Sequence, residues 1–417
     1  MNAEVISLGC RLNIAESETI HALLAGAGDV VVVNSCAVTA EAVRQTRQAI
    51  RRARRARPDA QLLVTGCAAE IERTQIAAMP EVDGLVANAR KLDARAYSPS
   101  SEGEGLGWGL SASAALDRQP PPLEAKLFRR NNGRGEAHTR AFVAVQNGCD
   151  HACTFCVIPQ GRGESRSLPV AAVLREVERH LAQGAPEVVL TGVDVTGWGQ
   201  DLAGRPALGS LVQAILDAFP ELRRLRLSSL DGVEIDEPLV ELLAGEERVM
   251  PHLHLSLQHG HDLILKRMKR RHSRADAVRL VERLLARRPG IAIGADLIAG
   301  FPTEDEAMHE ANRSIVRELG IVHGHVFPYS PRPGTPAARM PQLDKAVIKA
   351  RAAELRAEVA ALREAWLAGL VGQKLAVLAE ADGTGHSGNF ARVAVPGAVP
   401  GTIVAVTPRA VVEGLLQ

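Results

Sequence analysis

The chain has 417 residues, a formal net charge of +1 and 46% hydrophobic residues. This length exceeds one ordinary hydrophobic core, so we expect about two to four domains. A mean hydropathy near zero and the lack of an apolar run of about eighteen residues argue against a membrane span. The near-neutral charge excludes a uniformly basic protein of the histone kind. The first residues show no basic region or long apolar core, so we expect no secretory signal and a cytoplasmic protein.

The N-terminal region alternates short apolar runs with helical patterns, which is typical of a parallel α/β sheet. The predicted strands are residues 4–8, 30–33 and 62–64. A cysteine follows each run within a few residues, at Cys10, Cys36 and Cys67. Because parallel strands end at one edge of a sheet, we expect these three thiols to lie together there. Three separate buried core thiols are the alternative.

A second series of strands and helices starts after a stretch that is rich in Gly, Ser and Arg and is predicted to be a linker. The predicted strands are residues 141–146, 188–191, 222–227, 252–257, 291–297 and 324–327, and six such units favour an incomplete barrel. A polar helix then runs from 341 to about 370, and residues 373–417 alternate like a small antiparallel β-barrel. The fold class is therefore α/β, with domains at 1–96, 138–367 and 368–417 and a linker at 97–137.

Three further cysteines, Cys149, Cys153 and Cys156, lie in one short loop after the first strand of the second series. This position corresponds to the C-terminal face of a barrel, where active sites lie. A structural zinc site would need a fourth ligand, which His151 could supply. A 4Fe-4S cluster held by three cysteines would instead leave one iron open. Since the six cysteines divide into two sets of three, the missing fourth ligand occurs twice, which favours open clusters.

The loop pattern C-x3-C-x-F-C resembles the signature of the radical S-adenosylmethionine (SAM) superfamily. The resemblance implies that Cys149, Cys153 and Cys156 hold a 4Fe-4S cluster whose open iron binds SAM, with Phe155 near the adenine. The segments SLGCRLNIAES, NSCAVT and TGCAAE resemble the N-terminal domain of the radical SAM methylthiotransferases, the MiaB, RimO and MtaB group. This likeness implies a second 4Fe-4S cluster on Cys10, Cys36 and Cys67. It continues through LTGVDVTGWG, GADLIAGFPTED and GHSGNFARV, so it covers nearly the whole chain, and the C-terminal piece resembles an RNA-binding TRAM domain.

The resemblance implies an enzyme that replaces a C–H bond with C–S–CH3 and uses two SAM molecules. One SAM donates its methyl group to sulfur on the second cluster, and the other is cleaved to the radical that removes hydrogen from the substrate. The segments LTGVDVTGWG and HLHLSLQ most resemble the MtaB branch. The expected substrate is therefore N6-threonylcarbamoyladenosine at position 37 of transfer RNA. The alternatives are isopentenyladenosine in transfer RNA, an aspartate of a ribosomal protein, and a non-enzymatic, zinc-stabilised RNA-binding protein.

The expected partners are a tRNA anticodon stem-loop, SAM, an electron donor and a sulfur donor, and we expect a monomer that needs no membrane. The expected SAM contacts are Thr191, Gly192, Ser228, Gln258, Asp296, Ile298 and Gly300. Ordinary loop polar groups would explain Ser228 and Asp296 equally well. The chain departs from the family pattern after Gln258, where members read Q-S-G-S or Q-S-G-D. His259 and His261 stand there, which we interpret as a local substitution rather than a metal site.

Basic and aromatic residues predict where RNA binds. The expected contacts are Arg44, Arg47 and Arg51 in an arginine-rich helix, Lys269 and Arg270 in a second basic cluster, and Phe390 and Arg392 in the terminal barrel. Arginines would meet phosphates and the aromatic ring would stack on bases. Solvated helix faces are the alternative explanation of the two basic clusters.

Overall fold

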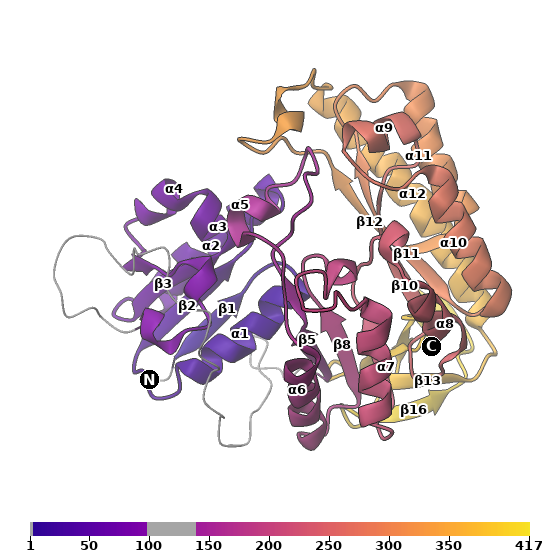
Figure 1. The fold of residues 1–417 in the computed structure, drawn as a ribbon, viewed down its shortest axis with the longest axis horizontal. Coiled ribbons are helices and arrows are strands. Elements are labelled where there is room, and N and C mark those ends of the chain that lie inside the picture. Colours follow the sequence, from indigo (N-terminus) through magenta and orange to yellow (C-terminus); the bar gives the residue numbers. More distant parts are fainter. Residues whose placement is uncertain (1–2, 98–138) are drawn as a thin grey trace. The chain divides into compact units, whose positions relative to one another are not determined.

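The computed structural model describes residues 3–97 and 139–417 (Figure 1). The chain divides into two compact units, of which unit 1 is Met1–His138 with Val157–Gly163 and unit 2 is Thr139–Cys156 with Glu164–Gln417. Apart from Tyr97, the predicted linker lies outside the described residues. The predicted domain boundaries stay predictions. Within the described ranges, the structure contains no helix that is both long and apolar enough to cross a membrane.

Unit 1 is built on a four-stranded parallel sheet in the order β1-β2-β3-β4. Its strands are β1 (Glu4–Ser7), β2 (Val30–Ser35), β3 (Gln61–Gly66) and β4 (Gly84–Leu85). Its helices are α1 (Arg11–Leu23), α2 (Ala40–Ala56), α3 (Cys67–Ile71), α4 (Arg73–Ala77), α5 (Ile158–Arg162), and the 3-10 turns η1 (Asn88–Arg90) and η2 (Ala94–Tyr97). All six residues of β2 are buried, because α1 packs on one face of the sheet and α2 to α4 on the other. The three predicted strands are confirmed.

Unit 2 contains two three-stranded parallel sheets, β5-β8-β9 and β10-β11-β12. The strands are β5 (Arg140–Ala144), β8 (Glu187–Thr191), β9 (Leu225–Leu227), β10 (His252–Gln258), β11 (Ala292–Ala299) and β12 (Ile321–Pro328). A parallel bridge between Leu230 and Leu255 connects the two sheets. The predicted strand 141–146 is divided, because β6 (Gln146–Asn147) turns away to pair antiparallel with β7 (Arg166–Ser167). The six predicted strands are otherwise present, with small differences in their bounds.

Helices cover one side of the two parallel sheets of unit 2 and enclose the largest hydrophobic core among the described residues. They are α6 (Val170–Ala182), α7 (Leu208–Ala218), α8 (Glu237–Gly245), α9 (Asp262–Arg267), α10 (Arg274–Arg287), α11 (Glu306–Glu318) and α12 (Lys345–Leu370), with 3-10 turns η3 (Val195–Gly197), η4 (Gly232–Glu234) and η5 (Pro336–Arg339). Helix α10 begins with a capping box between Ser273 and Asp276. Leucines at alternate positions of β10 (Leu253, Leu255 and Leu257) face the helices, so the intervening residues lie on the opposite face of the strand.

The C-terminal segment forms a six-stranded sheet in the order β16-β13-β14-β15-β18-β17. The strands are β13 (Leu375–Ala379), β14 (Thr384–Ser387), β15 (Arg392–Ala394), β16 (Ile403–Val406), β17 (Val411–Val412) and β18 (Leu415–Leu416). The sheet departs from the expected antiparallel pattern in one pairing, and its closure into a barrel stays a prediction. Strand β18 pairs parallel with β15, at Val393 and Leu416, because β17 and β18 form a short hairpin that returns the chain in the direction of β15.

Candidate active site

Cys10, Cys36 and Cys67 meet at the C-terminal edge of the sheet in unit 1. Cys10 follows β1, Cys36 follows β2 and Cys67 opens α3 directly after β3. Gly9 has a φ of 99°, and a Cβ at this position would lie 2.7 Å from Cβ and 2.8 Å from Sγ of Cys36, so only glycine permits this approach. Burial raises the pKa of Cys36 to about 11, and the neighbouring Cys10 and Cys67 also raise it. The structure brings the three thiols together, and their role as ligands stays a prediction.

A buried charge cluster of Glu16, Lys91 and Arg162 supports this edge. Glu16 Oε2 lies 2.5 Å from Lys91 Nζ, and Glu16 Oε1 lies 2.8 Å from Arg162 NH1, with all three side chains at most 3% exposed. Arg162 also donates to Asn13 Oδ1 at 2.5 Å, and Asn13 donates to the carbonyls of Leu8 and Ser35 at the strand ends. Two cations face one carboxylate, which leaves one positive charge beside the thiols. A positive charge in such a place favours thiolates over thiols.

The cysteine loop of unit 2 is held from several sides. Gln146 donates to the carbonyl of Gly148 at 2.8 Å and accepts from the backbone N–H groups of Val193 and Asp194. Thr154 donates to the carbonyl of Arg267 at 2.8 Å. Arg270 NH1 lies 3.6 Å from Sγ of Cys153, while NH2 of the same side chain donates to Asp231 at 2.9 Å. The loop therefore has a fixed conformation with a cation directed at one of its sulfurs.

His151 is engaged by carboxylates. Its Nε2 lies 2.8 Å from Asp194 Oδ2 and 3.6 Å from Glu234 Oε2. Hydrogen bonds to these two carboxylates raise the pKa of His151 to about 10. Cys149, His151 and Asp194 also lie close enough together to hold a metal ion, so the open-cluster and zinc interpretations both stay predictions.

Most of the expected SAM contacts lie at the C-terminal ends of neighbouring strands, on the face where barrel active sites are found. Thr191 ends β8, Gln258 ends β10 and Gly300 follows β11; Gly192 follows Thr191, Ser228 follows β9, and Ile298 lies near the end of β11. Gln258 has a φ of 69°, a strained conformation that is typical of functional sites. The Ser228 hydroxyl is buried and has no hydrogen-bond partner among the described residues, which fits a face that binds a polar ligand.

Two further SAM candidates, Phe155 and Asp296, do not lie at strand ends. Phe155 packs beside a small core that contains Ile298 and Phe301, so it neighbours the strand-end residues. Asp296 instead lies in the middle of β11 and contacts His254 and His325. Asp296 therefore shares a strand face with Ile298 but lies farther from the strand end than the other SAM candidates.

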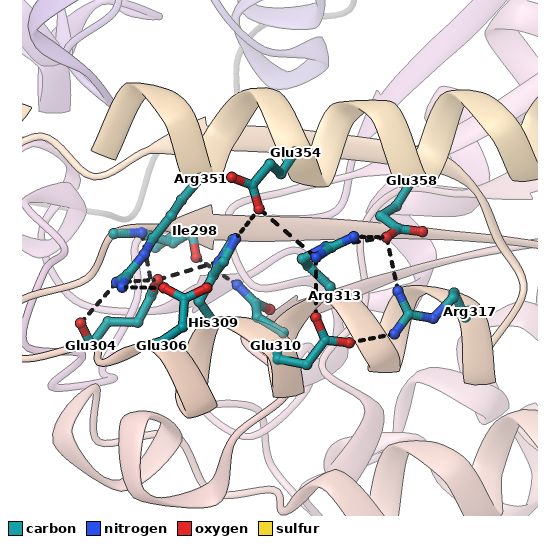
Figure 2. Close-up of polar contacts among 12 residues, drawn as sticks. Ile298, Glu304, Glu306, His309, Glu310, Arg313, Arg317, Arg351, Glu354 and Glu358 are labelled. Carbon is teal, nitrogen blue, oxygen red and sulfur yellow. Dashed lines mark hydrogen bonds and ion pairs between the residues drawn. The ribbon is translucent and has the colours of Figure 1, made fainter. Parts of the chain in front are cut away.

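Glu304 fixes the turn that follows β11. Its carboxylate accepts from the N–H groups of Gly300 at 3.0 Å and Phe301 at 3.2 Å, and it lies 3.1 Å from His259 Nε2 and 3.0 Å from Arg351 NH1. Burial raises the pKa of Glu304, but the hydrogen bonds from the histidines and the charge of Arg351 outweigh it and lower the pKa to about 2. Figure 2 shows that ion pairs continue from Glu304 along α11 and α12 through His309, Glu354 and Glu358.

The two atypical histidines have structural roles in this arrangement. His259 is fully buried against Glu304. The His261 ring accepts from the backbone N–H of Leu263 and so caps α9. Neither ring belongs to a group with metal-ligand geometry in the part of the chain that the structure describes. The interpretation as a local substitution agrees with these contacts.

We expect Glu304→Gln to destabilise the protein by about 3 kcal/mol, because Arg351 then loses its buried anionic partner. The dissociation constant for SAM should also rise, since the turn at Gly300 loosens. The matched control is Glu306→Gln, whose side chain pairs with the same Arg351 but is 85% exposed, and its cost should stay below about 1 kcal/mol. Thermal and urea unfolding measure the first effect and SAM titration the second. Equal stabilities of the two variants would contradict this role of Glu304.

Comparisons with known proteins agree with this geometry. Residues 143–314 match the Radical SAM superfamily model, and residues 2–87 match the model described as Uncharacterized protein family UPF0004. A relative from Rickettsia prowazekii (strain Madrid E), named threonylcarbamoyladenosine tRNA methylthiotransferase MtaB, is 43% identical over 94% of this chain and 90% of its own length. The chain belongs to the radical SAM methylthiotransferase family.

A second named relative and one solved structure are also similar to this chain. A tRNA-2-methylthio-N(6)-dimethylallyladenosine synthase from Erythrobacter litoralis (strain HTCC2594) is 34% identical over 93% of this chain and 88% of its own length. The radical SAM methyltransferase TsrM from Kitasatospora setae, solved with cobalamin and a 4Fe-4S cluster bound, aligns with a TM-score of 0.52 over 79% of this chain and 68% of that chain. At 19% identity, this last likeness supports the fold alone.

The arginine-rich helix α2 of the methylthiotransferase is largely paired. Arg44, Arg47 and Arg51 lie within 4 Å of Glu41, Glu72 and Glu81, respectively. Arg52 and Arg55 are exposed on the same helix, and neither has an acidic partner within the described ranges. The two unpaired arginines are therefore better placed to contact phosphates than the three that the sequence suggested.

The other four expected RNA contacts are two exposed cations and two residues that contact other parts of the protein. Lys269 is exposed, and Arg392 is exposed beside Asp382. Arg270 departs from the expectation, because its side chain is 7% exposed and is bound to Asp231 and the cysteine loop. Phe390 departs from it as well, because its ring stacks on His252 and His386 and lies under the guanidinium of Arg226.

Sequence reasoning missed the residues that hold the two cysteine sets. Glu16, Lys91 and Arg162 each lie in a short polar stretch without a distinctive pattern, and Arg162 is 146 positions from its partner Glu16. Gln146 could have been noticed, because a glutamine at the end of an apolar strand is unusual at a buried position.

Proposed function

We propose that this chain is a tRNA methylthiotransferase that converts N6-threonylcarbamoyladenosine at position 37 to its 2-methylthio derivative. The observation that carries the proposal is the 43% identity over 94% of the chain with the R. prowazekii relative of that name. The identity to the dimethylallyladenosine synthase from E. litoralis is lower, at 34%. Modification of isopentenyladenosine is therefore the second candidate.

We assign the two cysteine sets to two 4Fe-4S clusters, with SAM bound at the cluster of Cys149, Cys153 and Cys156. When bound, the clusters supply the electron that cleaves SAM and an open iron for the sulfur to be transferred. In the net reaction, the hydrogen of the substrate C–H bond ends in 5′-deoxyadenosine, and the methyl group comes from the second SAM. The chain's own contribution is positioning: Arg270 and Gln146 hold the cysteine loop, and Ser228 and Gln258 offer polar contacts to SAM. Glu16, Lys91 and Arg162 supply a positive charge beside Cys10, Cys36 and Cys67.

The C-terminal sheet is assigned a TRAM-like role in RNA binding, with Arg392 at its surface, and Lys269 is assigned a phosphate contact in the preceding domain. The enzyme is proposed to act as a cytoplasmic monomer that receives electrons and sulfur from separate donors. The assignment of RNA binding is supported by the likeness over 94% and 93% of this chain to two relatives that are named as tRNA-modifying enzymes.

Replacing both Arg52 and Arg55 with glutamine should weaken binding to an anticodon stem-loop. The slope of log affinity against log salt should fall by about 1 to 2, because two phosphate contacts are lost. Arg47→Gln is the matched control on the same helix, since that side chain is already paired with Glu72. An unchanged salt slope in the double variant would remove α2 from the RNA contact.

Nucleoside mass spectrometry of transfer RNA from a deletion strain tests the proposed function. We expect N6-threonylcarbamoyladenosine to accumulate and its 2-methylthio form to disappear, with recovery on expression of this chain. Loss of the 2-methylthio form of isopentenyladenosine instead would establish the second candidate. If neither 2-methylthio nucleoside changes, the proposed function is wrong, and an aspartate of a ribosomal protein becomes the substrate to test.

A further inference from the structure

A polar triad occupies the face of the β10-β11-β12 sheet opposite the helices. His254 Nε2 and His325 Nδ1 both lie 3.1 Å from the same oxygen, Oδ1 of Asp296. The neighbours Leu255 and Ala295 belong to the helix-covered core, so the triad points away from that core. The two imidazole rings lie 4.6 Å apart between centroids. The arrangement joins three adjacent strands.

The exposed fraction of the three side chains increases from His254 through Asp296 to His325. The side chains of His254, Asp296 and His325 are 6%, 21% and 62% exposed, respectively. A Cβ at Gly294 would collide with Nδ1 of His254, so the glycine makes room for that ring. Burial raises the pKa of Asp296, but the hydrogen bonds with His254 and His325 outweigh it and the net shift is downward. An ionised carboxylate therefore stands at the edge of solvent.

The triad has hydrogen-bonding capacity beyond its internal contacts. Among the described residues, the hydrogen bonds of His325 and Asp296 involve Nδ1 and Oδ1, and none is found for Nε2 of His325 or Oδ2 of Asp296. When Nδ1 of His325 carries the proton that faces Asp296, Nε2 of the same ring is an acceptor. These two acceptors suit a ligand that brings O–H and N–H donors.

An exposed aromatic ring lies next to the triad on β12. Phe327 is 37% exposed, and its ring centroid is 6.5 Å from that of His325. Residues two apart on a strand share a face. An aromatic ring in this place can stack on a nucleobase. Such stacking suits any base, because every base has a π face.

We propose that His254, Asp296 and His325 form the subsite that binds the N6 substituent of the modified adenosine, with Phe327 stacked on the base. The inference rests on the proposed function and adds which residues select the substituent. A threonylcarbamoyl group carries a hydroxyl and urea N–H donors, which match Asp296 and His325. Its carboxylate is repelled by Asp296 and must point away from it, toward the solvent-exposed side of the subsite at His325. A dimethylallyl group offers no donor, and burying it here would leave these polar groups unpaired.

Two anticodon stem-loops that differ only in the N6 substituent test the subsite with the full-length, cluster-loaded protein. For His325→Phe, we expect kcat/KM for the threonylcarbamoyl RNA to fall about 100-fold or more, while that for the dimethylallyl RNA stays equal or rises. His325→Gln retains an acceptor and should recover most of the preference. Formation of 5′-deoxyadenosine without RNA is measured in all three proteins, so that an effect on SAM cleavage is separated from an effect on the choice between the two RNAs.

Two outcomes would overturn the proposal. One is an unchanged ratio of the two kcat/KM values in His325→Phe. The other is a divalent metal, such as zinc, that the wild-type chain retains at one per molecule after cluster removal and that His325→Phe lacks. If the wild-type enzyme modifies neither RNA, the proposed function fails, but the relative affinity of the two RNAs for the wild-type and His325→Phe chains still tests the subsite.

Discussion

We expect Cys153→Ala to abolish the formation of 5′-deoxyadenosine, whereas Cys36→Ala leaves it intact and abolishes the methylthio product. Cys153 lies in the loop that Arg270 and Thr154 fix in unit 2, and Cys36 lies with Cys10 and Cys67 at the sheet edge of unit 1. If each set holds one cluster, each substitution should lower iron and sulfide from about eight to about four per chain. Chromatography of the nucleoside products and metal analysis measure the two effects.

His151→Ala is the control for this experiment, because the open-cluster proposal gives its ring no ligand role and the ring pairs with Asp194. It should leave the iron content unchanged. One or two zinc ions in a colourless protein, lost in His151→Ala, would instead support the zinc-stabilised RNA-binding alternative.

The second large effect should follow Glu16→Gln. This change leaves Lys91 and Arg162 buried without their shared anion, which costs about 3–5 kcal/mol. The matched control is Glu72→Gln, whose carboxylate pairs with the half-exposed Arg47, and it should cost less than about 1 kcal/mol. Urea unfolding of the full-length, cluster-free chain measures both.

The pH dependence of this stability has a defined sign. Burial raises the pKa of Glu16, but Lys91 and Arg162 outweigh it and the folded-state pKa lies below the usual 4.5. The contribution of Glu16 is therefore complete above its unfolded pKa and is lost as the pH falls through the folded pKa. An acid transition that is the same in the wild-type chain and in Glu16→Gln would contradict the ionised pair.

Short-range patterns were enough to predict that three of the cysteines lie together at one sheet edge. Apolar runs that end in Cys10, Cys36 and Cys67 define parallel strands, and parallel strands end at one edge. The cap of α10 was predictable for the same reason, since Ser273 and Asp276 lie within one turn. These features depend on residues that are neighbours in sequence.

Long-range electrostatics could not be predicted from the sequence. Arg270 belongs to a run of basic residues that resembles a phosphate-binding surface, yet Asp231 and the cysteine loop bury it. Phe390 occupies a loop that resembles an RNA contact, yet it packs against His252 and Arg226. The partner of a charge or a ring is set by tertiary packing, which the local pattern does not contain.

The most direct test of the central claim is mass spectrometry of the nucleosides formed when the purified, cluster-loaded chain, SAM and a reductant act on transfer RNA that contains N6-threonylcarbamoyladenosine. The account predicts a product that has gained one sulfur, one carbon and two hydrogens, and one 5′-deoxyadenosine for each product formed. Cleavage of SAM without any such product, on this RNA and on RNA that carries isopentenyladenosine, would contradict it.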